Sequence, residues 1–416
     1  MNSLTVPLYL FGHAGAIRRV ASSPMAVPAG ILLVFSAGVA RNYDQMWFGE
    51  SLSWLAMPFL FSLASGLWLF FFVFTRWQPR PDGGKCLLWH FKIRHLVSFY
   101  GLFWMTAPIA WLYAIPVERW YNPVPAAQWN IRLLTVVALW RIFLMSRVIS
   151  VIGEMSLLRA FGKVLLPAAL ETIAVVFVAG FGRQVMAGMG GLRNSPAEDV
   201  MISAFSTASH LALIAAAAAF LLQFACRKQP VRTELWRPDP NVRPWHAPYV
   251  LHAVVGVLCW RMSIKPQQEQ RLNFEAAQLA QRGNWTGLVA FLSQHRKEEF
   301  APSIVLPPSP YEHWGAQTMP DIFRHITPET PAWIRGMYFD YLEVLLPQER
   351  YLLNMPKEGG LDKLLTRLEA VEGGRELLRR CAKKLRETEG PNVDRKWKHG
   401  PTTVQEFLQR VESLPP

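Results

Sequence analysis

The chain carries little charge for its length and few cysteines. Of its 416 residues, 18% are charged and 51% are hydrophobic, whereas charged side chains make up about a quarter of an average soluble domain. The four cysteines lie far apart and lack the CxxC spacing of zinc and redox sites. They are predicted to be packing residues. The composition indicates that a lipid bilayer is the main solvent of this chain.

Acidic residues are especially scarce in the first 264 residues. That part holds 22 basic and 10 acidic residues, whereas the remaining 152 residues hold 21 basic and 20 acidic ones. The formal net charge of +13 therefore belongs almost entirely to the apolar part. There it is spread over short segments between apolar runs and forms no single patch with base-stacking aromatic residues. This distribution argues against nucleic-acid binding.

Long apolar runs dominate this part of the chain. A hydrocarbon core of ~30 Å needs about 20 helical residues. Seven runs come near that length, at residues 24–40, 54–74, 97–115, 133–152, 164–182, 203–225 and 247–262. Each is apolar all round, which favours lipid or deep burial over a surface position. The predicted fold is all-α, with a polytopic transmembrane helix bundle of six or seven spans (1–264) followed by a small soluble all-helical domain (265–416).

The basic residues alternate between loops and indicate an orientation. Fourteen Lys and Arg residues fall on one side of the expected membrane and five on the other. By the positive-inside rule, the N-terminus is cytoplasmic. The soluble domain is outside the cytoplasm with seven spans and inside with six. Arg261 argues against a crossing by residues 247–262, whereas Trp245 and Trp260 bracket that run as interfacial anchors do.

Two segments have a second interpretation. The pair Arg18-Arg19, the apolar run after it and the small residues at 36–40 resemble a signal peptide with a cleavage site. The multi-span context favours a retained span instead. Residues 87–96 mix apolar and basic side chains, which suits either a helix at the headgroup level or an inward extension of the third span.

Ionisable residues inside the predicted spans are the first candidates for a functional site, because each costs a few kcal/mol in hydrocarbon. They are Arg141, Arg147, Glu171, His210 and His252. The helical rise places Arg147 about 8 Å and Glu171 about 10 Å from the cytoplasmic ends of their spans. We therefore expect an Arg147–Glu171 ion pair, with His252 at a similar depth. Arg141 and His210 lie nearer the outer face without an acidic neighbour, so Arg141 is expected to snorkel.

The last 152 residues have the composition of a soluble helical domain. Apolar residues recur at helical spacing on both sides of Gly283, which predicts an αα-hairpin over residues 267–295. A Pro-rich connector at about 299–331 is too rich in proline for regular helix. Thr330 is expected to cap the next helix, with Pro331 in its first turn. A capping box from Thr403 to Glu406 is expected to start the last one.

Residues 276–285, Ala-Ala-Gln-Leu-Ala-Gln-Arg-Gly-Asn-Trp, resemble one tetratricopeptide hairpin in their small residues, turn glycine and aromatic residue. The resemblance covers fewer than 30 residues, and no 34-residue period follows. What it implies is a helical surface for a protein partner.

No pattern in the sequence predicts a catalytic set, a cofactor site or a metal site. The leading interpretation is a non-enzymatic integral membrane protein, a scaffold or component of a membrane assembly. Its contacts are the lipid bilayer and a protein partner bound through the residues after Lys265. The alternative is a proton-coupled or small-solute transporter that uses an Arg147–Glu171 polar layer.

Overall fold

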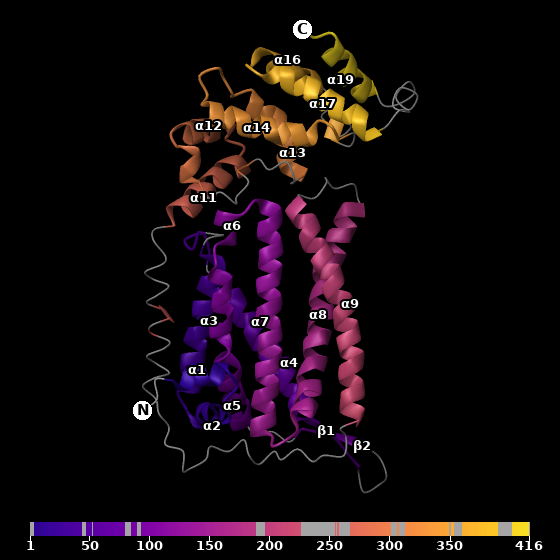
Figure 1. Cartoon of the computed structure of the whole chain (residues 1–416). Coiled ribbons are helices and arrows are strands. Elements are labelled where there is room, and N and C mark those ends of the chain that lie inside the picture. Colours follow the sequence, from indigo (N-terminus) through magenta and orange to yellow (C-terminus); the bar gives the residue numbers. More distant parts are fainter. Residues whose placement is uncertain are drawn as a thin grey trace. The chain divides into compact units, whose positions relative to one another are not determined.

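The computed structural model describes residues 4–43, 47–51, 53–79, 85–89, 93–188, 196–225, 254, 256–257, 267–300, 306–307, 313–348, 351–352, 360–389 and 402–415. Within these ranges the chain is helical except for one antiparallel hairpin, formed by β1 (Thr75–Pro79) and β2 (Lys85–Trp89). The chain divides into two compact units (Figure 1). The first unit comprises residues 1–182 and 196–267, and the second unit comprises residues 183–195 and 268–416.

Ten helices precede residue 226 in the described ranges: α1 (Thr5–Leu10), α2 (Ala14–Ser22), α3 (Ala26–Asn42), α4 (Ser53–Phe74), α5 (Ile93–Trp104), the 3-10 helix η1 (Ala107–Ala114), α6 (Val117–Trp120), α7 (Pro123–Ile152), α8 (Leu157–Gly188) and α9 (Pro196–Ala225). Helices α7, α8 and α9 run along a common direction (Figure 1). Many large apolar side chains on these helices are exposed, such as Leu139, Phe177 and Ile214. Such surfaces suit contact with lipid chains.

Several of these helices are long and apolar enough to cross a membrane, which supports a multi-pass membrane location. Five qualify singly, at Ala56–Phe74, His95–Trp120, Pro123–Ile152, Leu157–Phe177 and Ala197–Ala225. Helices α2 and α3, joined by a bend of 107°, add a sixth if the pair counts as one span. These stretches coincide with the first six predicted runs. The seventh, at 247–262, lies outside the described residues except for 254, 256 and 257.

Helix α3 packs against η1, α5 and α4. Glycine permits the close approach of α3 to α5, because a Cβ at Gly30 would lie 2.7 Å from the Cβ of Trp104. A Cβ at Gly101 of α5 would lie 3.0 Å from that of Ala26. Three later elements therefore pack on α3, and whether the first span is retained or cleaved stays a prediction.

Residues 4–22 form a packed segment that the sequence analysis did not predict. Helix α2 buries Ala16, Ile17 and Val20 and packs against α5 and α7. Helix α1 is fixed by side-chain hydrogen bonds: the Tyr9 hydroxyl donates to the carbonyl of Leu102 at 2.5 Å, and Trp140 Nε1 donates to the carbonyl of Leu10 at 3.0 Å. We call residues 4–22 the N-terminal segment.

The helix predicted over residues 87–96 is wrong for residues 87–89. These pair with residues 75–77 as strand β2. Pro81, Gly83 and Gly84 precede β2 in the sequence, and proline and glycine disfavour a continuous helix there. Helix α5 starts at Ile93. The third span therefore extends toward the N-terminal side only as far as that residue.

The second unit contains, in its described parts, α11 (Gln268–Gln281), α12 (Trp285–Ser293), η3 (Lys297–Glu299), α13 (His313–Phe323), α14 (Ala332–Leu345), α16 (Gly360–Ala370), α17 (Gly374–Glu389) and α19 (Thr402–Glu412). They share one hydrophobic core that includes Leu288, Leu342, Cys381 and Phe407. The αα-hairpin is confirmed as α11 and α12, and Gly283 takes a φ of 67° in the turn between them. Left-handed backbone of this kind favours glycine.

Two predictions for the connector at 299–331 and its end are wrong. Helix α13 forms despite Pro320 within it. Burying Met319, Ile322 and Phe323 completely contributes about 1.5–3 kcal/mol per side chain, which outweighs the loss of about 3 kcal/mol for an internal proline. The N-cap of α14 is Pro331, not Thr330. The Thr330 hydroxyl instead accepts a hydrogen bond from the backbone N–H of Thr327 at 2.9 Å.

Candidate functional site

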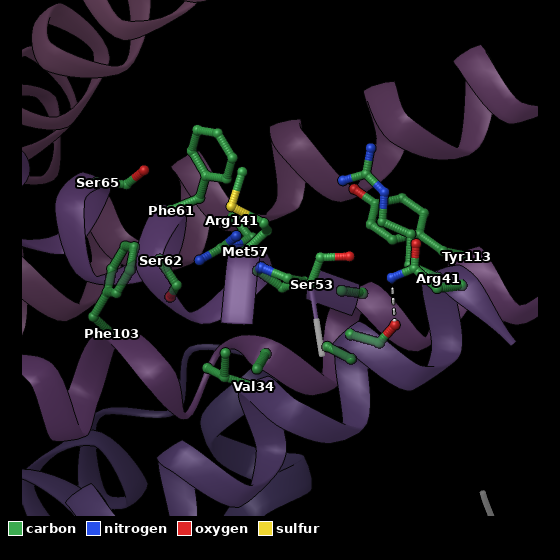
Figure 2. A pocket seen from close by; sticks show the side chains of 16 residues that line it. Val34, Arg41, Ser53, Met57, Phe61, Ser62, Ser65, Phe103, Tyr113 and Arg141 are labelled. Atoms are coloured by element: carbon green, nitrogen blue, oxygen red, sulfur yellow. Dashed lines mark hydrogen bonds between the residues drawn. The ribbon is translucent and has the colours of Figure 1, made fainter. Parts of the chain in front are cut away.

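A cavity of about 530 Å³ lies in the first unit between α3, α4, η1 and α7 (Figure 2). Arg41 and Arg141 are its charged lining residues, and no acidic residue of the described part lines it. The remaining polar groups come from Asn42, Ser53, Ser62, Ser65 and Tyr113. We call this the arginine cavity. Its volume is in the range of small-molecule sites.

Regular helix geometry explains how α4 supplies one wall of the arginine cavity. Ser53, Met57, Phe61 and Ser65 follow one another at intervals of four residues and all line it. Residues four apart lie on one helix face. At ~1.5 Å per residue, Ser53 and Ser65 are about 18 Å apart along the axis. The cavity therefore extends from the start of α4 to the middle of that helix.

The two guanidinium groups lie against aromatic rings. The Cζ atom of Arg141 is 5.1 Å from the centre of the Phe103 ring, and that of Arg41 is 5.8 Å from the centre of the Tyr113 ring. Arg41 is seen beside Tyr113 in Figure 2. Tyr113 is also within electrostatic range of Arg141. Within the described ranges, neither guanidinium has a hydrogen-bond acceptor or a salt bridge.

Glu171 does not line the arginine cavity but contacts a residue that does. The Ser65 hydroxyl, which lines the cavity, donates a hydrogen bond to Glu171 Oε1. Glu171 and Arg141 also interact electrostatically. The carboxylate and the guanidinium therefore belong to one polar region, which Ser65 connects to the cavity.

Helix α8 holds Glu171 in place through a row of contacts with α4. Lys163, Pro167 and Glu171 are spaced by four residues and lie on one face of α8. The carbonyl of Pro167 accepts from Trp68 Nε1 at 3.1 Å, and Lys163 Nζ donates to the carbonyl of Val73 at 3.1 Å. This α4–α8 contact row fixes the register of the two helices.

Arg147 and Glu171 have different partners in the structure, so the expected ion pair is replaced. Arg147 Nε donates to the carbonyl of Gly12 at 3.2 Å, in the turn between α1 and α2. The N-terminal segment packs on α7 and supplies this acceptor. The arginine in electrostatic range of Glu171 is Arg141. Arg141 therefore has an acidic group within electrostatic range, contrary to expectation, and its snorkelling stays a prediction.

Of the two histidine candidates, the structure describes only His210. His210 is exposed on α9, and His252 lies outside the described residues. The sequence analysis identified neither Arg41 nor Ser65 as a site residue. Ser62 and Ser65, three residues apart on one face of an apolar helix, were the signal for Ser65. The described residues contain no group of three or more His, Cys, Asp or Glu side chains placed to hold a metal ion.

Comparisons of the chain with protein-family models, with curated proteins and with solved structures found no match.

Proposed function

We propose that this chain is a non-enzymatic, multi-pass membrane protein whose second unit binds a protein partner within a membrane assembly. In this proposal the first unit is the membrane domain and the second unit is a soluble domain. The N-terminus is cytoplasmic, and residues 247–262 determine the side of the second unit.

The observation that carries the proposal is the difference between the surfaces of the two units. The first unit exposes many large apolar side chains on α4, α7 and α9, whereas the described large apolar side chains of residues 268–416 are buried or half-buried. Ion pairs cover the second unit, such as Lys384–Glu343 at 2.6 Å and Arg410–Glu369 at 2.7 Å. A water-compatible helical unit attached to apolar helices suits a role in docking. The tetratricopeptide-like hairpin α11–α12 offers a surface of the kind used for proteins.

The test compares the full chain with one that ends at Gln267. Both are expressed with an N-terminal tag in native membranes, cross-linked and purified. The full chain is expected to recover a protein that the truncated chain loses, because the proposed docking surface has been removed. Extraction of both chains with the membrane fraction is the control for insertion. Recovery of the same proteins by both chains would contradict the proposal.

A second candidate is a proton-coupled or small-solute transporter. The observation that favours it is Glu171, which is hydrogen-bonded to a cavity-lining serine and lies within electrostatic range of Arg141. Carboxylates inside a membrane domain often carry protons or contact solutes. In this proposal the polar layer consists of Glu171, Ser65 and Arg141, instead of Arg147 and Glu171.

Glu171→Gln is expected to lower proton flux into proteoliposomes at least tenfold, because an amide cannot take up and release the proton. Flux is measured with a trapped pH-sensitive dye. The matched control is Glu118→Gln, since Glu118 also accepts a side-chain hydrogen bond, at 2.5 Å from Asn130 Nδ2, but lies outside the cavity lining. Wild-type flux in the Glu171→Gln protein would rule out this candidate, as would the absence of flux in the wild-type chain.

A further inference from the structure

The charge of the arginine cavity is not balanced by the groups that line it. Two guanidiniums face a cavity without an acidic lining residue in the described part of the chain. The carboxylate of Glu171, behind Ser65, offsets one of the two charges. Among the described residues of this region, basic side chains therefore outnumber acidic ones by one. An uncompensated charge is costly where water is scarce, and this cost applies to half-buried Arg141 more than to exposed Arg41.

Arg141 cannot relieve this cost by reaching water along its own helix. It lies about 27 Å from the start of α7 and about 16 Å from its end, by the helical rise. An arginine side chain is much shorter than either distance. Its guanidinium donors have no acceptor among the described residues, although the Phe103 ring covers one face of the group. The N–H groups at the edge of the guanidinium thus remain available to a ligand in the cavity.

The remaining lining groups suit an anion with several oxygen acceptors. The hydroxyls of Ser53, Ser62 and Tyr113 can donate hydrogen bonds in addition to those of the guanidiniums. Arginine binds carboxylate and phosphate with two parallel N–H···O bonds, and such charge-assisted bonds are about twice as strong as neutral ones. Met57, Phe61 and Val34 supply apolar surface for the rest of a ligand.

We propose that the arginine cavity binds a ligand with an oxyanion group, a phosphate or a carboxylate, held between Arg141 and Arg41. The cavity, at about 530 Å³, is larger than such a group alone, so the oxyanion belongs to a larger molecule. This molecule is either a small solute or the headgroup of an anionic lipid. The site depends on neither the partner-binding role nor proton transport.

The main experiment measures binding of inorganic phosphate to the purified full chain in nanodiscs of phosphatidylcholine. Titration calorimetry at constant ionic strength, with chloride as the reference anion, gives the dissociation constant. Arg141→Met and Arg41→Met are each expected to weaken phosphate binding at least tenfold. Arg132→Met is the matched control: Arg132 is on the same helix and also lies over an aromatic ring, Trp129 at 4.8 Å, but it does not line the cavity. It is expected to bind as the wild type does.

A second arm distinguishes the source of the oxyanion. The wild-type and Arg141→Met chains are placed in nanodiscs that contain phosphatidylglycerol, and native mass spectrometry counts the lipids that stay bound. Retention of phosphatidylglycerol by the wild type alone identifies a lipid headgroup. Saturable phosphate binding without anionic lipid identifies a soluble ligand. Binding of neither probe by the wild-type chain would overturn the proposal, as would equal binding by all variants.

Loss of the fold must be separated from loss of the site. Arg141→Lys keeps the positive charge and is expected to retain weaker phosphate binding with an unchanged thermal unfolding midpoint. Phosphate is also expected to raise the unfolding midpoint of the wild-type chain more than chloride does at equal ionic strength, because it binds the folded state. If the wild-type chain unfolds at the same midpoint in phosphate and in chloride, the proposal is contradicted, and this test needs no substitution.

Discussion

Leu342→Ala is expected to lower the free energy of unfolding of the second unit by about 2–5 kcal/mol. Leu342 is completely buried in the core of that unit, where α14 packs against α17. Removing most of its side chain leaves a cavity that the surrounding helices fill only in part. This is among the larger effects that a single substitution can have on a domain of this size.

The thiol of Cys381 provides the measurement. It is buried in the same core, and burial raises its pKa to about 12. Because the thiolate is the reactive form, a thiol reagent labels this residue only when the second unit opens. In a chain whose other three cysteines are replaced by serine, the labelling rate at increasing urea concentration reports the stability of the second unit. A rate unchanged by Leu342→Ala would contradict the assignment of Leu342 to the core.

Gly336→Ala is the control, with an effect of opposite sign on the same helix. A Cβ at Gly336 would meet nothing within 4 Å. Replacing an interior helical glycine by alanine then reduces the entropy of the unfolded chain and favours the helix by about 0.5–1 kcal/mol. Slower labelling of Cys381 is expected. The two substitutions together separate packing from helix propensity within α14.

Gly30→Ala is expected to destabilise the first unit by about 1–3 kcal/mol, the usual range for overpacking. The added methyl group would lie 2.7 Å from the Cβ of Trp104 and 3.5 Å from the carbonyl carbon of the same residue. These atoms are part of or adjacent to the backbone, so α3 and α5 must move apart. The thermal unfolding midpoint of the purified chain in detergent, followed by tryptophan fluorescence, is expected to fall.

Gly15→Ala tests whether any added methyl group in the first unit has this effect. The nearest atoms to a Cβ at Gly15 belong to the side chain of His13, at 3.2 Å and 3.4 Å. A side chain can rotate away more easily than a helix can shift. The midpoint is therefore expected to change little. An equal loss of stability at both glycines would contradict the specific role of the contact between α3 and α5.

The helices that are long and apolar enough to cross a membrane were predictable from the sequence, because bilayer thickness determines both their length and their composition. Breaks at Gly283 and Gly373 were also predictable: both take a positive φ in the structure, and glycine adopts that backbone readily. These signals are local. They depend on a residue and its near neighbours, without reference to the rest of the fold.

What the sequence did not reveal depends on contacts between distant segments. Arg147 and Glu171 lie at matching depths, but depth does not say which face of α7 turns toward α8. Arg147 instead contacts the N-terminal segment, whose short helices contain no long apolar run that the sequence analysis could detect. Similarly, the helix around Pro320 forms because its apolar residues reach a core built mainly from later helices. Proline content alone gave the opposite prediction.

The contacts of the N-terminal segment imply an order of events during synthesis. The segment leaves the ribosome before the groups that hold it, which come from Leu102, Trp140 and Arg147. The segment therefore cannot complete its docking until Arg147 has been made. Until then, the pair Arg18-Arg19 and the apolar face of α2 remain available to the insertion machinery or to the bilayer surface. Closure of α1 and α2 onto α5 and α7 is consequently a late step in the assembly of the first unit.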